Sequence, residues 1–201
     1  MKFKNLEITG FKSFSEKTTI LIEKGLTGIV GPNGCGKSNI VEALRWCMGE
    51  NSAKSMRGSG MEDVIFSGTS NRPSKNISEV ALLLDNQEKS GPIQYKEFDE
   101  ISIKRKIEKD KGSKYYINDK EVRARDVQTF FADLSTGAHS PSLISQGRIG
   151  QLVTAKPIER KSILEEAAGI SGIHARRQEA ETRLNAAENN LKRADELKRQ
   201  Q

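Results

Sequence analysis

Residues 31–38 read GPNGCGKS and match the pattern G-x-x-x-x-G-K-[ST] at every fixed position. An aliphatic run that is typical of a strand, Leu26–Val30, leads into this motif, and an amphipathic helix is predicted to follow from Ser38 to Gly49. In such an arrangement the backbone N–H groups of the loop and the N-terminus of the helix together form a site for phosphate. The stretch therefore predicts an α/β fold of the P-loop NTPase type with a site for a nucleoside triphosphate.

Each residue type in the motif has a chemical reason. Glycine permits the backbone angles and the close approach that the loop needs, Lys37 is expected to neutralise the β- and γ-phosphates, and the Ser38 hydroxyl is expected to ligate Mg²⁺. Cys35 allows two interpretations, a redox-sensitive thiol or a residue of which only the backbone N–H matters, and we favour the second. The predicted ATP-binding residues of the loop are Gly31, Pro32, Asn33, Gly34, Cys35, Gly36, Lys37 and Ser38.

Hydrolysis needs a second metal-binding group, which in P-loop proteins is commonly an Asp at the end of an aliphatic strand. The segment Ala81–Asp85 has this form. We reject it, because Asn86 follows where a hydrolytic ATPase of this type carries a carboxylate, and because the chain contains no Ser-Gly-Gly signature segment. The chain is therefore expected to bind ATP without hydrolysing it alone.

The composition excludes several classes of protein. Of the 201 residues, 35% are hydrophobic and 30% are charged, with 33 Lys+Arg against 27 Asp+Glu and a net charge of +6. There is no run of about 18 apolar residues, so neither a transmembrane helix nor a membrane partner is expected. The N-terminus lacks an apolar signal segment, and two cysteines make neither a disulfide framework nor a zinc site. We expect a cytoplasmic protein.

Short β-branched runs separated by glycine predict a sheet outside the motif. Besides strands within residues 1–30, the expected strands are Val80–Leu84, Ile101–Ile107, Tyr115–Ile117 and a strand end at Leu143-Ile144. Asn118-Asp119 is a plausible hairpin turn. Apolar residues at helical spacing predict a helix through Val127, Phe130, Phe131 and Leu134.

The last third of the chain has a different character. Pro157 suits the first turn of a helix, and Gly169 and Gly172 are expected to break or kink it. From Ile173 to Gln201 there is no Gly, Pro or aromatic residue, and a thin heptad seam of Ala and Leu predicts about four heptads of coiled coil. This polar segment accounts for an apolar share below the usual ~45–50%. Its partner helix is expected to come from another chain or from chain beyond this segment.

Six segments of the chain resemble the head of a structural maintenance of chromosomes (SMC) ATPase. The match runs in order along nearly the whole chain. The segments that carry it are Gly10–Phe14, Gly31–Glu50, Arg57-Gly58, Met61–Thr69, Ile144–Ile149 and Lys156–Ile170.

The resemblance implies roles for five further residues. Lys12 and Ser13 resemble residues beside the ribose and phosphates, and Asn39 lies in the segment beside the α-phosphate. Arg57 resembles the arginine that reaches the phosphates when two heads engage. Gln146 resembles the glutamine that touches Mg²⁺ and the attacking water. The implied catalytic set is therefore Lys37, Arg57 and Gln146, and the implied metal ligands are Ser38 and Gln146.

The departures from the family pattern define what is missing. SMC proteins carry a second half of the head at their C-terminus, with the signature motif, an aliphatic-Asp-Glu strand and a switch histidine, and none of these is found here. We therefore interpret residues 1–171 as an N-terminal half-head, with a mixed sheet around the P-loop helix, and residues 172–201 as the root of a coiled-coil arm. The resemblance implies four partners: a C-terminal half-head, a second SMC subunit in a homodimer, a kleisin-type subunit and double-stranded DNA on the nucleoid.

A basic segment indicates where DNA is expected to bind. Residues 102–125 hold nine Lys/Arg against four Asp/Glu, with Tyr115 and Tyr116 among them. Such a cluster attracts phosphates without reading sequence, although it is equally typical of a solvated surface. The resemblance favours DNA, and the expected contact residues are Lys104, Arg105 and Lys106.

Two alternatives remain open. One is a small P-loop kinase acting on a metabolite, for which about 200 residues suffice; the terminal heptad helix speaks against it. The other is the head of a related double-strand-break repair ATPase, against which the Phe11–Phe14 segment and Arg45-Trp46 speak.

Overall fold

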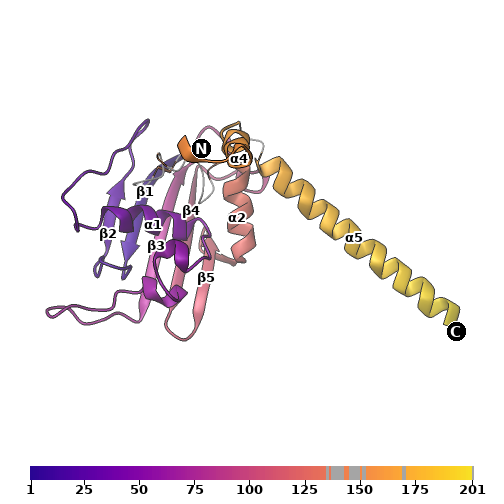
Figure 1. Ribbon diagram of the computed structural model, residues 1–201, viewed down its shortest axis with the longest axis horizontal. Helices are drawn as coiled ribbons and strands as arrows, with labels where there is room; N and C mark the ends of the chain where they lie inside the picture. The colour runs from indigo at the N-terminus through magenta and orange to yellow at the C-terminus, as the bar shows by residue number, and fades with distance from the viewer. Residues whose placement is uncertain (135, 137–142, 145–149, 151–152, 169–170, 201) are drawn as a thin grey trace.

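The structure is a computed structural model that describes residues 1–134, 136, 143–144, 150, 153–168 and 171–200. Its centre is one six-stranded sheet in the order β2-β1-β3-β4-β5-β6, and every strand pair is antiparallel (Figure 1). The strands are β1 (Lys2–Thr9), β2 (Thr18–Leu21), β3 (Ile77–Asp85), β4 (Glu100–Glu108), β5 (Gly112–Ile117) and β6 (Lys120–Val122). The helices are α1 (Lys37–Cys47), α2 (Ala124–Asp133), α4 (Pro157–Ala167) and α5 (Ser171–Gln200), with short 3₁₀ turns η1 (Lys54–Met56), η2 (Met61–Val64) and η3 (Ile93–Tyr95).

One face of the sheet carries the core. Helix α1 packs against β3 and β4, and helix α2 packs against β5. In β3 and β4 every second residue is buried, which is the period expected of a sheet with one covered face. Trp46 of α1 is fully buried and its ring lies 5.4 Å from that of Phe11. The P-loop helix is thereby fixed on the sheet by its C-terminal half.

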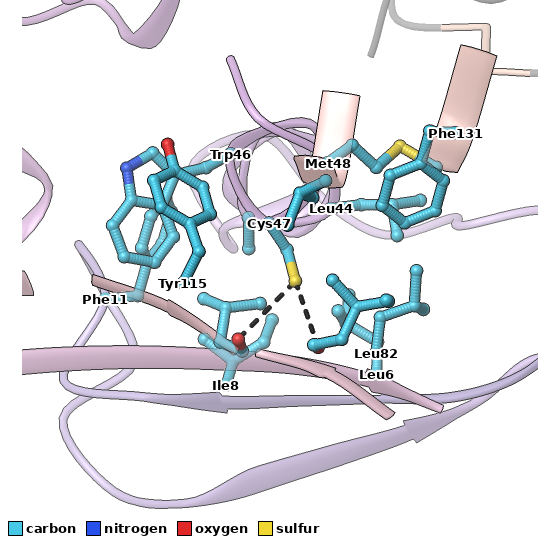
Figure 2. Close-up of a cluster of buried hydrophobic side chains, with 14 of the residues drawn as sticks. Leu6, Ile8, Phe11, Leu44, Trp46, Cys47, Met48, Leu82, Tyr115 and Phe131 are labelled. Atoms are coloured by element: carbon cyan, nitrogen blue, oxygen red, sulfur yellow. Dashed lines mark hydrogen bonds between the residues drawn. The ribbon is translucent and has the colours of Figure 1, made fainter. Parts of the chain in front are cut away.

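Cys47 lies at the point where α1 meets the sheet (Figure 2). Its Sγ lies 3.5 Å from the carbonyl oxygen of Val80 and 3.4 Å from that of Ile103, and these two oxygens share its single S–H donor. Burial raises the pKa of the Cys47 thiol to about 12. This cysteine is therefore a small packing residue that stays protonated, and not a reactive thiol.

The local predictions for the sheet are largely confirmed. The strands at Val80–Leu84, Ile101–Ile107 and Tyr115–Ile117 are present and longer than predicted. Asn118 and Asp119 both have positive φ, 48° and 61°, and join β5 to β6 as the predicted tight turn.

Three predictions about secondary structure are wrong. Leu26–Val30 is not a strand: it pairs with no other strand in the described part of the chain, and its Leu26 and Val30 are 99% and 92% exposed. A strand without a neighbour leaves its backbone groups to water and buries no side chain, so local propensity alone does not maintain it. Leu143-Ile144 forms no strand either, and Gly172 lies inside α5 instead of breaking a helix.

The C-terminal helix is the most extended part of the molecule. Helix α5 contacts α2 near its start and then projects away from the sheet (Figure 1). Leu184 and Leu191, both on the predicted seam, are 61% and 67% exposed. The predicted helix is confirmed, whereas the boundary at residues 171/172 stays a prediction. Among the described residues, no helix has the length and apolar character needed to cross a bilayer.

Candidate nucleotide-binding site

The loop of residues 31–36 leads directly into α1. Gly36 caps the helix with φ 93°, and Gly34 has φ 84°, so two of the motif's glycines occupy backbone angles that other residues rarely adopt. Lys37 Nζ donates to the carbonyl oxygens of Gly31, at 2.6 Å, and Pro32, at 2.5 Å. The lysine is thus held over the loop by the loop's own backbone. Cys35 is exposed beside it, with its Sγ 3.8 Å from Lys37 Nζ.

The segment after β1 brings Lys12 and Ser13 to the start of α1. Lys12 N donates to the carbonyl oxygen of Val64 at 2.7 Å, which fixes this turn against the 3₁₀ turn η2. A Cβ placed on Gly36 would lie only 3.0 Å from Ser13 Oγ, so the glycine lets the two segments approach closely. Asn39 Nδ2 donates to the same Ser13 hydroxyl at 2.9 Å. Three predicted site residues, Ser13, Gly36 and Asn39, are therefore neighbours.

Arg57 joins the same group from a third segment. Its Nη2 donates to Asn39 Oδ1 at 2.8 Å, and its Nε lies 2.5 Å from Glu42 Oε1. Lys12 Nζ forms an ion pair with the other oxygen of Glu42 and donates to the carbonyl oxygen of Met56. We call Lys12, Asn39, Glu42 and Arg57 the Glu42 cluster. Two of the predicted nucleotide-site residues outside the loop, Lys12 and Arg57, thus pair with one carboxylate, and Asn39 is linked to it through Arg57.

Glu42 is the residue that the sequence analysis missed. It lies one helical turn after Ser38, and only 7% of its surface is exposed. A charged residue in the middle of an amphipathic helix is normally solvated, so its sequence position alone gives no signal.

Besides Ser38, the sequence analysis considered two metal-binding features, Gln146 and the segment Ala81–Asp85. Gln146 lies outside the described residues, so its role stays a prediction. The rejected segment Ala81–Asp85 is in strand β3, where Asp85 pairs with Lys2 and Glu79 pairs with Thr9. The turn that carries Lys12 begins just after Thr9, at the end of β1 that pairs with Glu79. Asp85 is at the opposite end of the β1–β3 ladder, about 20 Å from Glu79 at ~3.3 Å per residue. No cluster of three or more metal-binding side chains occurs among the described residues.

The assignment of Arg105 to a DNA surface is wrong. Because successive strand residues point to opposite faces, Arg105 points into the core while Lys104 and Lys106 face outward, and Arg105 is only 2% exposed. Its guanidinium lies between the rings of Trp46 and Tyr115, at 4.4 and 4.6 Å, and donates to the carbonyl oxygens of Trp46 and Glu50 at 2.9 and 2.6 Å. It joins the end of α1 to the sheet.

Lys104 and Lys106 remain on the uncovered face of the sheet. Lys104 Nζ lies 3.0 Å from Asp119 Oδ1, and this hydrogen bond raises the pKa of Lys104. Lys106 stands opposite Glu79 on β3 and Lys114 on β5. The Lys104–Asp119 ion pair is at the surface and contributes little to stability, so Lys104 can exchange its acidic partner for a polyanion at low cost.

A comparison with protein families identifies the chain. The model described as "RecF/RecN/SMC N terminal domain" matches residues 2–148. The chain belongs to this family.

Two relatives match nearly the whole chain at high sequence identity. A "Chromosome partition protein Smc" from Cereibacter sphaeroides is 57% identical over 197 residues, which are 98% of this chain and 17% of the relative. The protein of the same name from Rhodopseudomonas palustris is 55% identical over 197 residues, with the same coverage. The chain therefore spans about a sixth of the length of the curated relatives it matches.

Solved SMC heads have the same fold. An Smc head "bound to the C-winged helix domain of ScpA" matches with a TM-score of 0.77 and 33% identity over 85% of this chain and 52% of that one. A Pyrococcus furiosus Smc head with an extended coiled coil, bound to the C-terminal domain of ScpA, gives a TM-score of 0.75 and 34% identity over 98% and 49%. The predicted resemblance to the N-terminal half of an SMC head and the α/β P-loop fold class are confirmed. Neither the kinase nor the repair alternative is favoured.

Proposed function

We propose that the chain is the ATP-binding N-terminal half of an SMC head that acts in chromosome condensation and partition. The observation that carries this proposal is the loop geometry: Gly34 and Gly36 with positive φ, and Lys37 held over the loop by two backbone carbonyl oxygens. These features fit a triphosphate, because the Lys37 ammonium and the N-terminal, positive end of α1 lie together at the loop, where they favour negative charge. The Ser38 hydroxyl and the Gln146 side chain would hold the Mg²⁺ that accompanies the nucleotide. When bound, ATP and Mg²⁺ supply the phosphoryl group and the charge that polarises it.

The proposed half-head needs a complement. Leu26–Val30 leads into the loop with apolar side chains in water, and the curated relatives are about six times longer than this chain. We infer that a strand from the C-terminal half of the head pairs with Leu26–Val30, whether that half belongs to the same full-length chain or to a separate one. The same half supplies the signature segment and the carboxylate that this chain lacks. ATP hydrolysis is accordingly a property of the completed head.

The experiment that tests the function uses ATP binding and hydrolysis together. The chain is expected to bind ATP·Mg²⁺ by itself without turnover, and hydrolysis is expected when the C-terminal half-head is added. Lys37→Ala is expected to abolish both, because it removes the cation that faces the phosphates. Hydrolysis by this chain alone, or phosphoryl transfer to a nucleoside or sugar, would contradict the proposal and revive the kinase.

Two protein partners follow from the relatives. Solved SMC heads with this fold are described in complex with ScpA domains, and one is described under "ATP-driven dimerization and DNA stimulated activation of SMC ATPases". We propose that this head engages a second copy when ATP is bound, with Arg57 reaching the phosphates, and that the completed head binds a kleisin-type subunit. Gel filtration of the completed head with and without ATP tests the first part.

We also propose that duplex DNA binds the uncovered face of the sheet through Lys104 and Lys106, which would bring the cytoplasmic protein to the nucleoid. Lys104→Glu/Lys106→Glu is expected to weaken DNA binding and reduce the salt slope by about 2, since each lysine that contacts a phosphate contributes roughly one. The matched control is Lys89→Glu/Lys96→Glu, two exposed lysines in the loop between β3 and β4. Equal loss in both double variants would indicate net charge alone and remove this face from the proposal.

A further inference from the structure

A single buried carboxylate connects the three segments around the predicted phosphate site. The Glu42 side chain is 10% exposed, and its two oxygens are used by two cations: Oε2 pairs with Lys12, from the turn after β1, and Oε1 lies 2.5 Å from Nε of Arg57, which follows η1. Glu42 itself is on α1, one turn after Ser38. A carboxylate this well buried is stable only when its charge is matched by partners, and here both partners are predicted nucleotide-site residues.

The backbone at both cations is unusual. Lys12 has φ 46° and Arg57 has φ 54°, in the left-handed region that residues with a Cβ seldom occupy. Such conformations persist where the surrounding contacts over-determine them, and they concentrate at functional sites. The ion pairs with Glu42 are contacts of that kind for both residues.

The freedom of the two cations differs. The Lys12 side chain is 14% exposed, whereas the Arg57 side chain is 58% exposed, so solvent alone would leave the guanidinium free to adopt many rotamers. Its Nε and Nη2 are instead directed by Glu42 and Asn39, the latter also bonded to Ser13. The guanidinium is held in one orientation at the edge of the P-loop.

We propose that Glu42 is a positioning residue of the nucleotide site: its carboxylate orients the Arg57 guanidinium for the phosphates and keeps Lys12 beside the loop. This inference rests on the proposed ATPase function. Without the negative charge, two cations would repel each other across a site already rich in positive charge, and Arg57 would return to solvent. A displacement of about 1 Å in a positioning group can reduce a rate by a factor of about 100. Loss of the Glu42 charge is therefore expected to lower kcat.

The test is a double-mutant cycle in the full-length ATPase, measured as kcat and KM for ATP. Glu42→Gln keeps the shape of the side chain and removes its charge, and it is expected to lower kcat by about 10- to 100-fold. In an Arg57→Ala background the same substitution is expected to lower kcat by less than about twofold, because the residue being oriented is gone. Glu50→Gln is the matched control: Glu50 is also buried at 6%, pairs with Arg45 and lies beyond the other end of α1.

Each outcome is informative. A loss of kcat that is equal with and without Arg57, or equal to the loss in Glu50→Gln, would make Glu42 a structural residue and overturn the inference. Should Glu42→Gln fail to fold, Glu42→Asp replaces it in the same cycle, since it keeps the charge but is one methylene too short to reach both cations. If the wild-type protein binds ATP but the double-mutant cycle shows no coupling between Glu42 and Arg57, this inference alone is refuted. If the wild-type protein does not bind ATP, the proposed function is refuted and this inference with it.

Discussion

The strands of the sheet and the segment that enters the P-loop have similar sequences and different structures. Val80–Leu84 and Leu26–Val30 are both short aliphatic runs, and both predict strands. The first lies in β3 between β1 and β4, with Leu82 fully buried. The second pairs with no strand in the described part of the chain, and Leu26 is 99% exposed. The difference teaches that strand propensity becomes a strand only when a neighbour supplies hydrogen bonds and a surface to bury against.

The largest expected effect comes from making the same substitution in both runs. Leu82→Ala is expected to lower the free energy of unfolding by about 2–5 kcal/mol, because it removes a buried side chain and leaves a cavity. Leu26→Ala is expected to change it by less than about 0.5 kcal/mol, as for an exposed site. Urea unfolding of the two variants measures the contrast. Similar losses in both would mean that Leu26–Val30 is already part of the folded core.

A smaller contrast separates the two faces of β4. Arg105→Ala is expected to cost about 2–4 kcal/mol, because it leaves buried carbonyl oxygens without donors and removes the cation between two rings. Lys106→Ala, one residue along on the outer face, is expected to be neutral within about 0.5 kcal/mol. The order of the two effects reverses for DNA affinity, because Lys106→Ala is expected to weaken DNA binding. If Lys106→Ala were destabilising and Arg105→Ala neutral, the side of β4 that carries Lys106 would face the core, which would contradict the structure.

The smallest effect is a pH dependence at the junction of α1 and the sheet. Burial raises the pKa of Cys47 from 9.0 to about 12, so the unfolded chain loses this proton at lower pH than the folded chain does. The contribution to stability is therefore complete below pH 9 and is lost between pH 9 and about pH 12. At pH 10 the loss is expected to be about 1 kcal/mol relative to pH 8. Cys47→Ala should lack this component, and identical pH profiles for the two proteins would contradict the assigned burial.

Local sequence patterns predicted much of the fold. The strands at Val80–Leu84 and Ile101–Ile107, the Asn118-Asp119 turn and the helix after the P-loop are all confirmed, because each depends on neighbours along the chain. The patterns did not predict which side of β4 faces the core at Arg105. The tally of basic residues in that segment ignored the period of two, which alone separates Arg105 from Lys104 and Lys106.

The candidate site was predicted in part. The loop residues, and the grouping of Ser13 and Arg57 with Asn39 of α1, follow from the motif and the family resemblance. Glu42, which joins them, was missed because its role depends on two cations that are 30 and 15 residues away in the chain. Contacts of this kind depend on tertiary packing, and no periodicity or motif encodes them.

The measurement that tests the central claim most directly is hydrogen exchange at Leu26–Val30, in this chain alone and after addition of the C-terminal half-head. These amides are expected to exchange almost without protection in the isolated chain and to become protected in the completed head, in step with the appearance of ATP hydrolysis. The amides of β3 and β4 should be protected in both states and serve as the internal reference. Protection of Leu26–Val30 in the isolated chain, or hydrolysis by a completed head in which they stay unprotected, would contradict the claim that a strand of the C-terminal half completes the ATPase head at this segment.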